Sequence, residues 1–268
     1  MREDEPAGSV AAPLVRQLPL ALTAPSGAGR AGLALAAAPL GWLDAHRAGI
    51  LHPDEEALLT DRLHARRRHG LLVGRYAAKR ALAVLHPDRD PRGFAIRPGV
   101  LEQPVLSAEG LGNLGVSLSH AGPVAVAIAF PEGCPMGIDL ERARPDLVPL
   151  LLDQTLPAER QCLAACLDAP EAERLTRLWC LKEALSKALR CGLTVPTALL
   201  AVGGIERSAQ GLVATFANFA QYQGLSFAAG DLAAALVWPR TVTLSIAAAD
   251  RAGWQAALAE AAAGWPGD

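Results

Sequence analysis

Carboxylate and ammonium side chains stand at spacings that suit phosphate chemistry. Asp139 and Glu141 are two residues apart in the segment GIDLE, so on a β-strand both would point to the same face. Two neighbouring carboxylates repel each other, and a hard divalent cation held by oxygen ligands removes that repulsion. A solvated strand edge whose charges oppose aggregation would also show this pattern. GIDLE therefore predicts either a metal site or a charged strand edge.

A second set of groups lies on a predicted helix over residues 171–190, where Lys182, Glu183 and Lys187 lie on the polar side and Glu183 and Lys187 are i,i+4 neighbours. Taken alone, such a pair is an ordinary ion pair worth about 0.2–0.5 kcal/mol. The chain has 25 lysines and arginines, and its lysines are Lys79, Lys182 and Lys187. The scarcity of lysine is explained most simply by a GC-rich coding bias unconnected with this protein's function. Where a lysine is kept against that bias it marks a position to inspect for a needed ammonium group, because lysine can give up a proton and arginine in practice cannot.

Ser119 and His120 end a predicted strand, and an arginine-rich segment over residues 62–80 precedes them. No G-x-S-x-G elbow surrounds a serine, which argues against a serine hydrolase. The basic segment is consistent with a solvated face, a nucleic-acid patch or a polyphosphate site. Carboxylates for a metal, ammonium groups, a histidine and clustered arginines are together the groups that phosphoryl transfer uses.

The composition limits the function classes. The chain has 268 residues, 51% of them hydrophobic and 19% charged, which predicts a folded protein of one or two domains. A net charge of −2 disfavours a dedicated nucleic-acid binder. Its five cysteines form no C-x-x-C pair, which indicates reduced thiols. We identify neither a signal peptide nor a membrane span, so we expect a cytoplasmic protein without membrane contacts.

The chain divides into three predicted parts: a loosely ordered extension over residues 1–30, a first α+β half over 31–135, and a second α+β half over 136–268 that carries the metal and catalytic motifs. In the first half we expect a strand near 33–40 and helical structure over 54–85 with a break at Gly70. The remaining predicted elements are a hairpin of strands 116–120 and 124–130, a strand at GIDLE, helices 157–168 and 171–190, and a run of strands from 199 onward.

GIDLE and WCLKEALSKA resemble the two signature motifs of the 4′-phosphopantetheinyl transferases, G-[IV]-D-x-E and W-x-x-K-E-[AS]-x-x-K. SLSHAG is similar to the family's S-H-x-G element, and GRYAAK is similar to the G-R-x-A-A-K helix of its larger, Sfp-type members. The resemblance covers roughly residues 50–195. It implies an α+β fold, a monomeric pseudo-dimer of two similar halves with coenzyme A bound between them.

The resemblance also implies roles for individual residues. Mg²⁺, or Mn²⁺, would be held by Asp139, Glu141 and Glu183. The phosphates of coenzyme A, the substrate, would meet Ser119, His120, Asp139, Lys182, Arg68, Arg75 and Lys79. Glu183 would take the proton of a carrier-protein serine, and Lys187 would stabilise or protonate the leaving 3′,5′-ADP, with His120 assisting catalysis.

The implied activity is a Mg²⁺-dependent transfer of 4′-phosphopantetheine to a serine of an apo acyl or peptidyl carrier protein, of the holo-acyl-carrier-protein synthase type. Such carriers serve polyketide, nonribosomal-peptide or fatty-acid synthesis. The alternative is a catalytically silent relative that binds coenzyme A or a carrier. Many relatives have a G-K-P lysine before the S-H-x-G strand, whereas this chain has Gln103 before Pro104.

Overall fold

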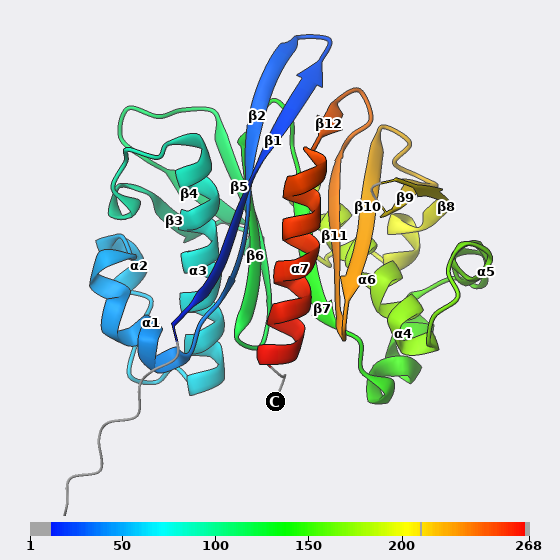
Figure 1. The fold of residues 1–268 in the computed structure, drawn as a ribbon, viewed down its shortest axis with the longest axis horizontal. Helices are drawn as coiled ribbons and strands as arrows, with labels where there is room; N and C mark the ends of the chain where they lie inside the picture. The colour runs from blue at the N-terminus through cyan, green and yellow to red at the C-terminus, as the bar shows by residue number, and fades with distance from the viewer. Residues whose placement is uncertain (1–11, 210, 266–268) are drawn as a thin grey trace, which may run out of the picture.

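The fold consists of two antiparallel five-stranded sheets, each with a long helix on one face (Figure 1). It is seen in a computed structural model that describes residues 12–209 and 211–265. Two sheets and their helices confirm the predicted α+β class, and the arrangement is consistent with a pseudo-dimer of two similar halves.

The first sheet has the order β12-β1-β2-β6-β5 and is covered by α3. Helix α3 packs on β2 and β6, and short helices and a two-stranded sheet lie around it. The elements up to residue 131 are β1 (Leu14–Ala24), β2 (Gly27–Ala37), α1 (Leu40–His46), α2 (Pro53–Glu56), α3 (Ala65–Leu85), β3 (Ala95–Pro98), β4 (Pro104–Ser107), β5 (Leu114–Ala121) and β6 (Val124–Pro131).

The second sheet has the order β7-β11-β10-β9-β8 and is covered by α6, which packs on β7 and β11 as α3 packs on β2 and β6. The strand that follows this sheet in the chain, β12, belongs to the first sheet and pairs with β1 at its edge. The elements are β7 (Gly137–Arg142), α4 (Val148–Gln154), α5 (Pro157–Cys166), α6 (Glu171–Ala188), β8 (Val202–Ser208), β9 (Gly211–Phe216), β10 (Tyr222–Ala229), β11 (Leu232–Pro239), β12 (Thr243–Ser245) and α7 (Ala248–Gly264).

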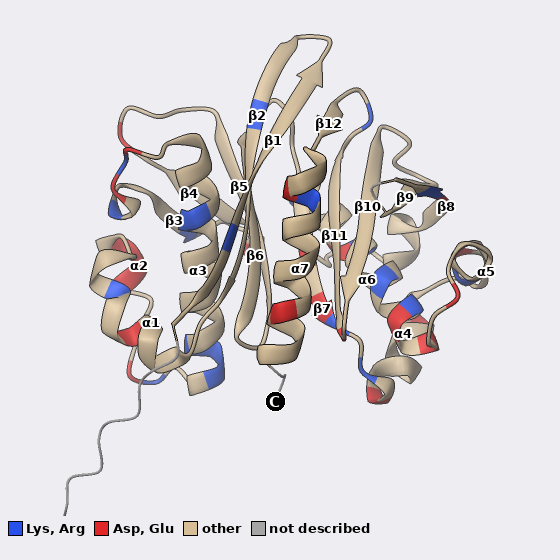
Figure 2. Cartoon of the chain, viewed as in Figure 1, with Lys and Arg blue, Asp and Glu red and all other residues tan. Residues whose placement is uncertain are grey.

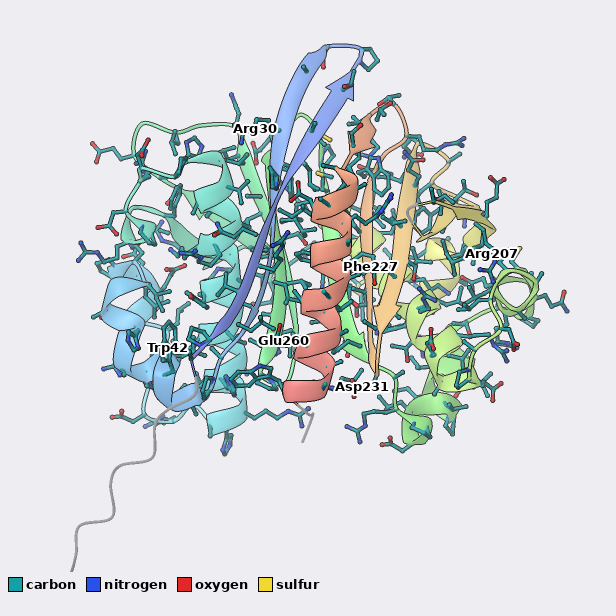
Figure 3. All side chains as sticks on the ribbon, viewed as in Figure 1. Arg30, Trp42, Arg207, Phe227, Asp231 and Glu260 are labelled. Atoms are coloured by element: carbon teal, nitrogen blue, oxygen red, sulfur yellow. The ribbon has the colours of Figure 1, made fainter. Side chains whose placement is uncertain are left out.

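Three apolar clusters form the core. One joins the facing sides of the two sheets and α7. It contains Phe227 of β10, which is labelled in Figure 3, and the ring of this residue lies edge-on to that of Trp254. The second lies between the first sheet and α3, and the third between the second sheet and α6. Strands β6, β10 and β11 carry no charged residue, whereas charges concentrate on helices and loops (Figure 2). Uncharged strands allow both faces of each sheet to be buried.

The two sheets meet at their edge strands, β5 and β7. Two serine hydroxyls of β5 cross this seam: Ser117 Oγ accepts from the backbone N–H of Ile138 at 3.1 Å, and Ser119 Oγ donates to Asp139 at 2.7 Å. Edge strands otherwise expose unpaired backbone groups. The seam therefore places the end of the S-H-x-G strand directly beside the GIDLE strand.

Several predictions about the elements are confirmed. The hairpin forms β5 and β6, GIDLE lies on β7, and the helix predicted over 171–190 is α6. No helix in the described part of the chain combines the length and apolar character that a bilayer crossing requires.

Three other expectations differ from the structure. Residues 1–11 of the predicted loose extension lie outside the described residues, but 14–24 and 27–30 form β1 and the start of β2, because cross-strand pairing offsets their Pro and Ala content. The predicted helix break is not at Gly70, which lies inside α3, but over 57–64. The sequence reasoning also missed α7, whose alanine-rich surface packs on β1 and β10.

Candidate functional site

Asp139 is the centre of the polar cluster at the seam. Its side chain is buried, Lys187 Nζ of α6 lies 2.6 Å from its Oδ1, and Ser119 donates to the same oxygen. The other oxygen, Oδ2, is buried without a hydrogen-bond partner. An unpaired carboxylate oxygen in the interior costs free energy, so this atom is poised for a ligand that the protein itself does not provide.

Glu141 and Glu183 extend this cluster. Desolvation, the Asp139 carboxylate and Glu183 raise the pKa of Glu141 to about 8. Burial and Asp139 also raise the pKa of Glu183, against the opposing effect of Lys187. Burial disfavours the charged form of Lys187, but Asp139, Glu183 and Glu141 outweigh it and raise the pKa of this ammonium group. Burial is the largest cause of both raised carboxyl pKa values, and the neighbouring carboxylates add to it.

The donor set suits a hard divalent cation, because three carboxylates crowd together and one buried oxygen lacks a partner. Within residues 12–209 and 211–265, however, no three His, Cys, Asp or Glu side chains stand as a ready metal-ligand group. The chemistry of the residues thus fits the predicted Asp139, Glu141 and Glu183 ligands, and their metal-binding role remains a prediction.

A cavity of about 430 Å³ lies between the two halves beside this cluster. The second half contributes Glu183, Ser186, Lys187 and Arg190 of α6 to its wall. The first half contributes Arg67, Leu71 and Arg75 of α3, parts of β5 and β6, and the loop around residues 98–104. An apolar cavity with charged groups at one side suits a ligand that has both a phosphate and a less polar part.

His120 lies on the α3 side of the seam, against Gly70. A Cβ at position 70 would overlap the imidazole, so the missing side chain of this helical glycine makes room for it. Desolvation by the surrounding protein, together with the cations Lys187, His69 and Arg66, lowers the pKa of His120. These groups gather positive charge from both halves at one place, which is suited to a polyanion.

The predicted phosphate ligands separate into two groups. Arg75 lines the cavity, and Ser119 and His120 end β5 beside it. Arg68 forms an ion pair with Asp44 at 2.6 Å, so its positive charge is partly neutralised before any phosphate binds. In the described part of the chain no carboxylate lies within ion-pair distance of Arg66 or Arg67. His69 was not among the predicted ligands, although it lies in the arginine-rich segment that sequence reasoning had marked, whereas the Arg66–Arg68 cluster was expected to hold the 3′-phosphate in place of the missing lysines.

Lys79 and Lys182 are not at the cavity. Lys79 is buried, 2.8 Å from Glu55, and it also donates to the carbonyl oxygen of Phe94. Lys182 is buried 2.9 Å from Glu159. The helical pattern placed Lys182 on the polar side of its helix, and that placement is wrong because a buried carboxylate receives it. As placed, neither ammonium group faces a ligand in the cavity.

Gln103, which stands where many relatives have a lysine, shapes the loop at the cavity wall. Its side-chain oxygen accepts from the backbone N–H of Leu101 at 2.9 Å, and its backbone oxygen accepts from Gly99 at 2.7 Å. These bonds close a tight loop in which Glu102 has a φ of 62°. The residue therefore lines the cavity through a folded loop and brings no charge to it.

The second half of the chain matches a known family. Residues 135–237 match the family model described as the 4′-phosphopantetheinyl transferase superfamily. This match confirms the resemblance that the motifs indicated, and the matched range contains β7, α6 and the strands of the second sheet as far as β11. Among proteins with curated functions, none matches the chain.

Proposed function

Because residues 135–237 carry the sequence pattern of the 4′-phosphopantetheinyl transferase superfamily, we propose that this protein transfers 4′-phosphopantetheine from coenzyme A to a serine of an apo acyl or peptidyl carrier protein. Phosphopantetheinyl transfer is the activity that the family implies, with coenzyme A as substrate and carrier proteins as acceptors. The observation that carries the proposal is the placement of Glu183 and Lys187 on the wall of a cavity, with Lys187 bound to Asp139.

In the proposed reaction, the serine oxygen forms a bond to the β-phosphorus of coenzyme A while the bond to the bridging pyrophosphate oxygen breaks, and 3′,5′-ADP leaves. Glu183 accepts the serine proton, a role that a carboxylate on the cavity wall can take as a general base. Lys187 supplies positive charge and then a proton to the leaving phosphate.

Mg²⁺, or Mn²⁺, would be held by Asp139, Glu141 and Glu183 and would neutralise charge that develops on the pyrophosphate. The protein's own nitrogen-bearing side chains would contact the other end of the ligand. His120, His69, Arg66 and Arg75 come from β5 and α3 of the first half, whereas Lys187 comes from α6 of the second. Both halves thus contribute charge to one polyanion. This two-sided contribution agrees with binding of coenzyme A between them.

The test is to incubate the protein with an apo carrier protein, coenzyme A and Mg²⁺ and to weigh the carrier by mass spectrometry. We expect the mass to increase by one phosphopantetheinyl group, and the increase to disappear with EDTA. If none of several apo carriers gains mass while calorimetry still shows coenzyme A binding, the protein is a catalytically silent binding protein and not an enzyme.

A further inference from the structure

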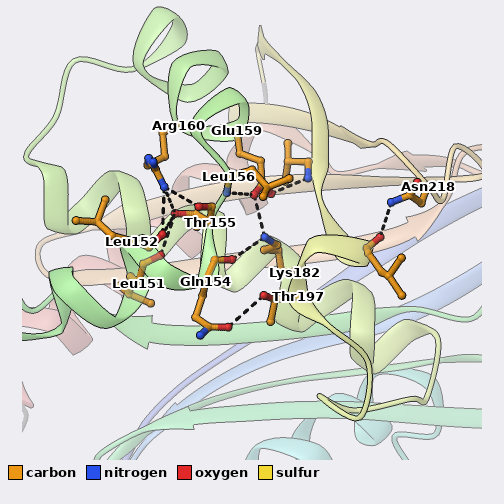
Figure 4. A network of polar contacts seen from close by, with 12 residues as sticks. Leu151, Leu152, Gln154, Thr155, Leu156, Glu159, Arg160, Lys182, Thr197 and Asn218 are labelled. Atoms are coloured by element: carbon orange, nitrogen blue, oxygen red, sulfur yellow. Dashed lines mark hydrogen bonds and ion pairs between the residues drawn. The ribbon is translucent and has the colours of Figure 1, made fainter.

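A buried ion pair joins α6 to the rest of the second half. Glu159 and Lys182 are 1% and 0% exposed, and Lys182 Nζ also donates to the carbonyl oxygen of Gln154 at 2.7 Å. Figure 4 shows this network where α4, α5 and α6 meet. No member of the pair lines the cavity, and the catalytic proposal above uses neither of them.

The Glu159 carboxylate binds the backbone at two further points. Its Oε2 accepts from the N–H of Leu156, at the start of α5, at 2.6 Å. Its Oε1 accepts from the N–H of Val202, the first residue of β8, at 2.8 Å. One side chain therefore connects the beginning of α5, the middle of α6 and the beginning of β8.

This connection fixes α6 next to its reactive residues. In an α-helix successive residues are turned by about 100°, so the direction of Lys182 also sets the directions of Glu183 and Lys187. A buried ion pair is a poor source of stability, because apolar residues of similar volume often do as well or better. The ion pair of Lys182 differs from apolar packing because it fixes the rotation of α6 about its own axis and the position of α6 along that axis.

We propose that Glu159 is a positioning residue for the chemistry of α6: through Lys182 it holds the helix so that Glu183 and Lys187 reach the reacting atoms. This inference rests on the phosphopantetheinyl transfer proposed above. The substrate does not touch Glu159, so its effect is expected on the rate of the chemical step and not on the affinity for coenzyme A.

The first half contains a matched pair that serves as a control. Glu55 Oε2 lies 2.8 Å from Lys79 and accepts from the N–H of His52 at 2.8 Å. Its Oε1 accepts from the N–H of Ile96 in β3 at 3.1 Å. Both halves thus contain a buried ion pair whose glutamate also accepts from two backbone N–H groups, but α3 carries neither Glu183 nor Lys187. Because Glu55 also contacts Arg75, the two pairs are compared by kcat alone.

The experiment measures kcat, the KM for coenzyme A and the urea midpoint of Glu159→Gln and Glu55→Gln. We expect both variants to unfold at lower urea concentrations by similar amounts, since each loses one buried charge. We expect Glu159→Gln to lower kcat about tenfold or more with a KM within about twofold, and Glu55→Gln to keep kcat within about twofold. Equal losses of kcat in the two variants would overturn the proposal, because Glu159 would then act through stability alone.

A crystal structure of Glu159→Gln adds a readout that does not depend on activity. We expect α6 to turn or shift so that Lys187 loses its contact with Asp139, while the first half stays unchanged. An unmoved α6 would overturn the positioning role. If the wild-type protein transfers nothing, the proposed function fails, and the position of α6 still decides whether Glu159 holds the helix.

A second variant covers the case in which Glu159→Gln does not fold. In the double variant Glu159→Met/Lys182→Met, two apolar side chains of similar length fill the same space, which favours folding. We expect this protein to be folded by circular dichroism and to show the same loss of kcat. A folded double variant with the wild-type kcat would show that the ion pair has no positioning role.

Discussion

The β2–α3 and β7–α6 units share one scaffold but differ in their chemical groups. In each unit a glycine of the strand, Gly32 or Gly137, lies so close to the helix that a Cβ would overlap a backbone carbonyl oxygen of Ala81 or Ala184. In each, the lysine two residues before that alanine is buried against a glutamate. The sequences KRALAV (79–84) and KEALSK (182–187) therefore occupy equivalent places.

Four equivalent positions, counted from the matched glycines and lysines, carry the proposed reactive groups of the second unit and other residues in the first. The pairs are Ala34 and Asp139, Ala36 and Glu141, Arg80 and Glu183, and Val84 and Lys187. On the strand the first unit buries alanines where the second has carboxylates, and on the helix it has an arginine and a valine where the second has Glu183 and Lys187. The scaffold is thus present twice, while the groups proposed for acid–base and metal chemistry lie in the second unit, and the first supplies cations from α3. Four sets of variants test this division.

The largest effect is expected at Glu183. Glu183→Gln keeps the size of the side chain but removes its ability to accept a proton, so we expect transfer to fall about 10²–10⁴-fold. The equivalent change in the first unit, Arg80→Gln, loses a hydrogen bond to Gln17 and should leave the rate within about twofold. Carrier modification followed by mass spectrometry measures both. A Glu183→Gln protein with more than about a tenth of the wild-type rate would argue against proton transfer at this position.

Lys187→Arg comes next. Arginine keeps the positive charge beside Asp139, but it cannot supply a proton to the leaving phosphate, so we expect kcat to fall about tenfold or more. Steady-state kinetics should show a smaller change in the KM for coenzyme A. Wild-type kcat in this variant would mean that charge alone suffices at position 187.

The two glycines at the strand–helix contacts, Gly32 and Gly137, test whether helix packing and catalysis can be affected separately. Gly32→Ala and Gly137→Ala should each lower the free energy of unfolding by about 1–3 kcal/mol, because the strand and helix must move apart. Urea denaturation measures this loss. At temperatures where both variants are folded, we expect a clear loss of kcat only for Gly137→Ala, since its strand carries Asp139. A larger loss of kcat in Gly32→Ala than in Gly137→Ala would show that catalysis depends on the first unit more than on the second.

The smallest effect concerns Glu141 in metal-free protein. Its folded pKa of about 8 lies above the ordinary glutamate pKa of 4.5, so its contribution to stability is complete below pH 4.5 and is lost as the pH rises through 8. In EDTA at pH 8.5 we therefore expect Glu141→Gln to melt about 2–4 °C higher than wild type. The difference should shrink at pH 5.5, which differential scanning fluorimetry can follow. An equal difference at both pH values would contradict the charge crowding at Asp139.

Local sequence was enough to predict the elements whose patterns are strong. The alternation in GIDLE and in residues 116–130, and the apolar spacing of 171–190, predicted β7, the β5–β6 hairpin and α6. Residues 14–24 show only the short alternation of Leu18, Leu20 and Leu22, and residues 248–264 lack such a pattern. The first segment becomes a strand because it pairs with β2 along its whole length, and the second becomes α7 because its apolar side packs against β1 and β10. Those partners are distant in the chain.

The sequence by itself determined which groups are available for chemistry: the carboxylates of GIDLE, the pair Glu183 and Lys187, and the scarcity of lysine. The tertiary structure decided where the lysines go. A helical pattern cannot show whether a lysine faces solvent, a ligand or a buried carboxylate 23 or 24 residues away, as Glu159 and Glu55 are from Lys182 and Lys79. A local signal existed, since each glutamate follows a proline by two residues in the first turn of a short helix and accepts from the backbone N–H of the N-cap residue. It could be interpreted only once the fold had brought each glutamate against its long helix, because an ammonium group is buried only where a carboxylate receives it.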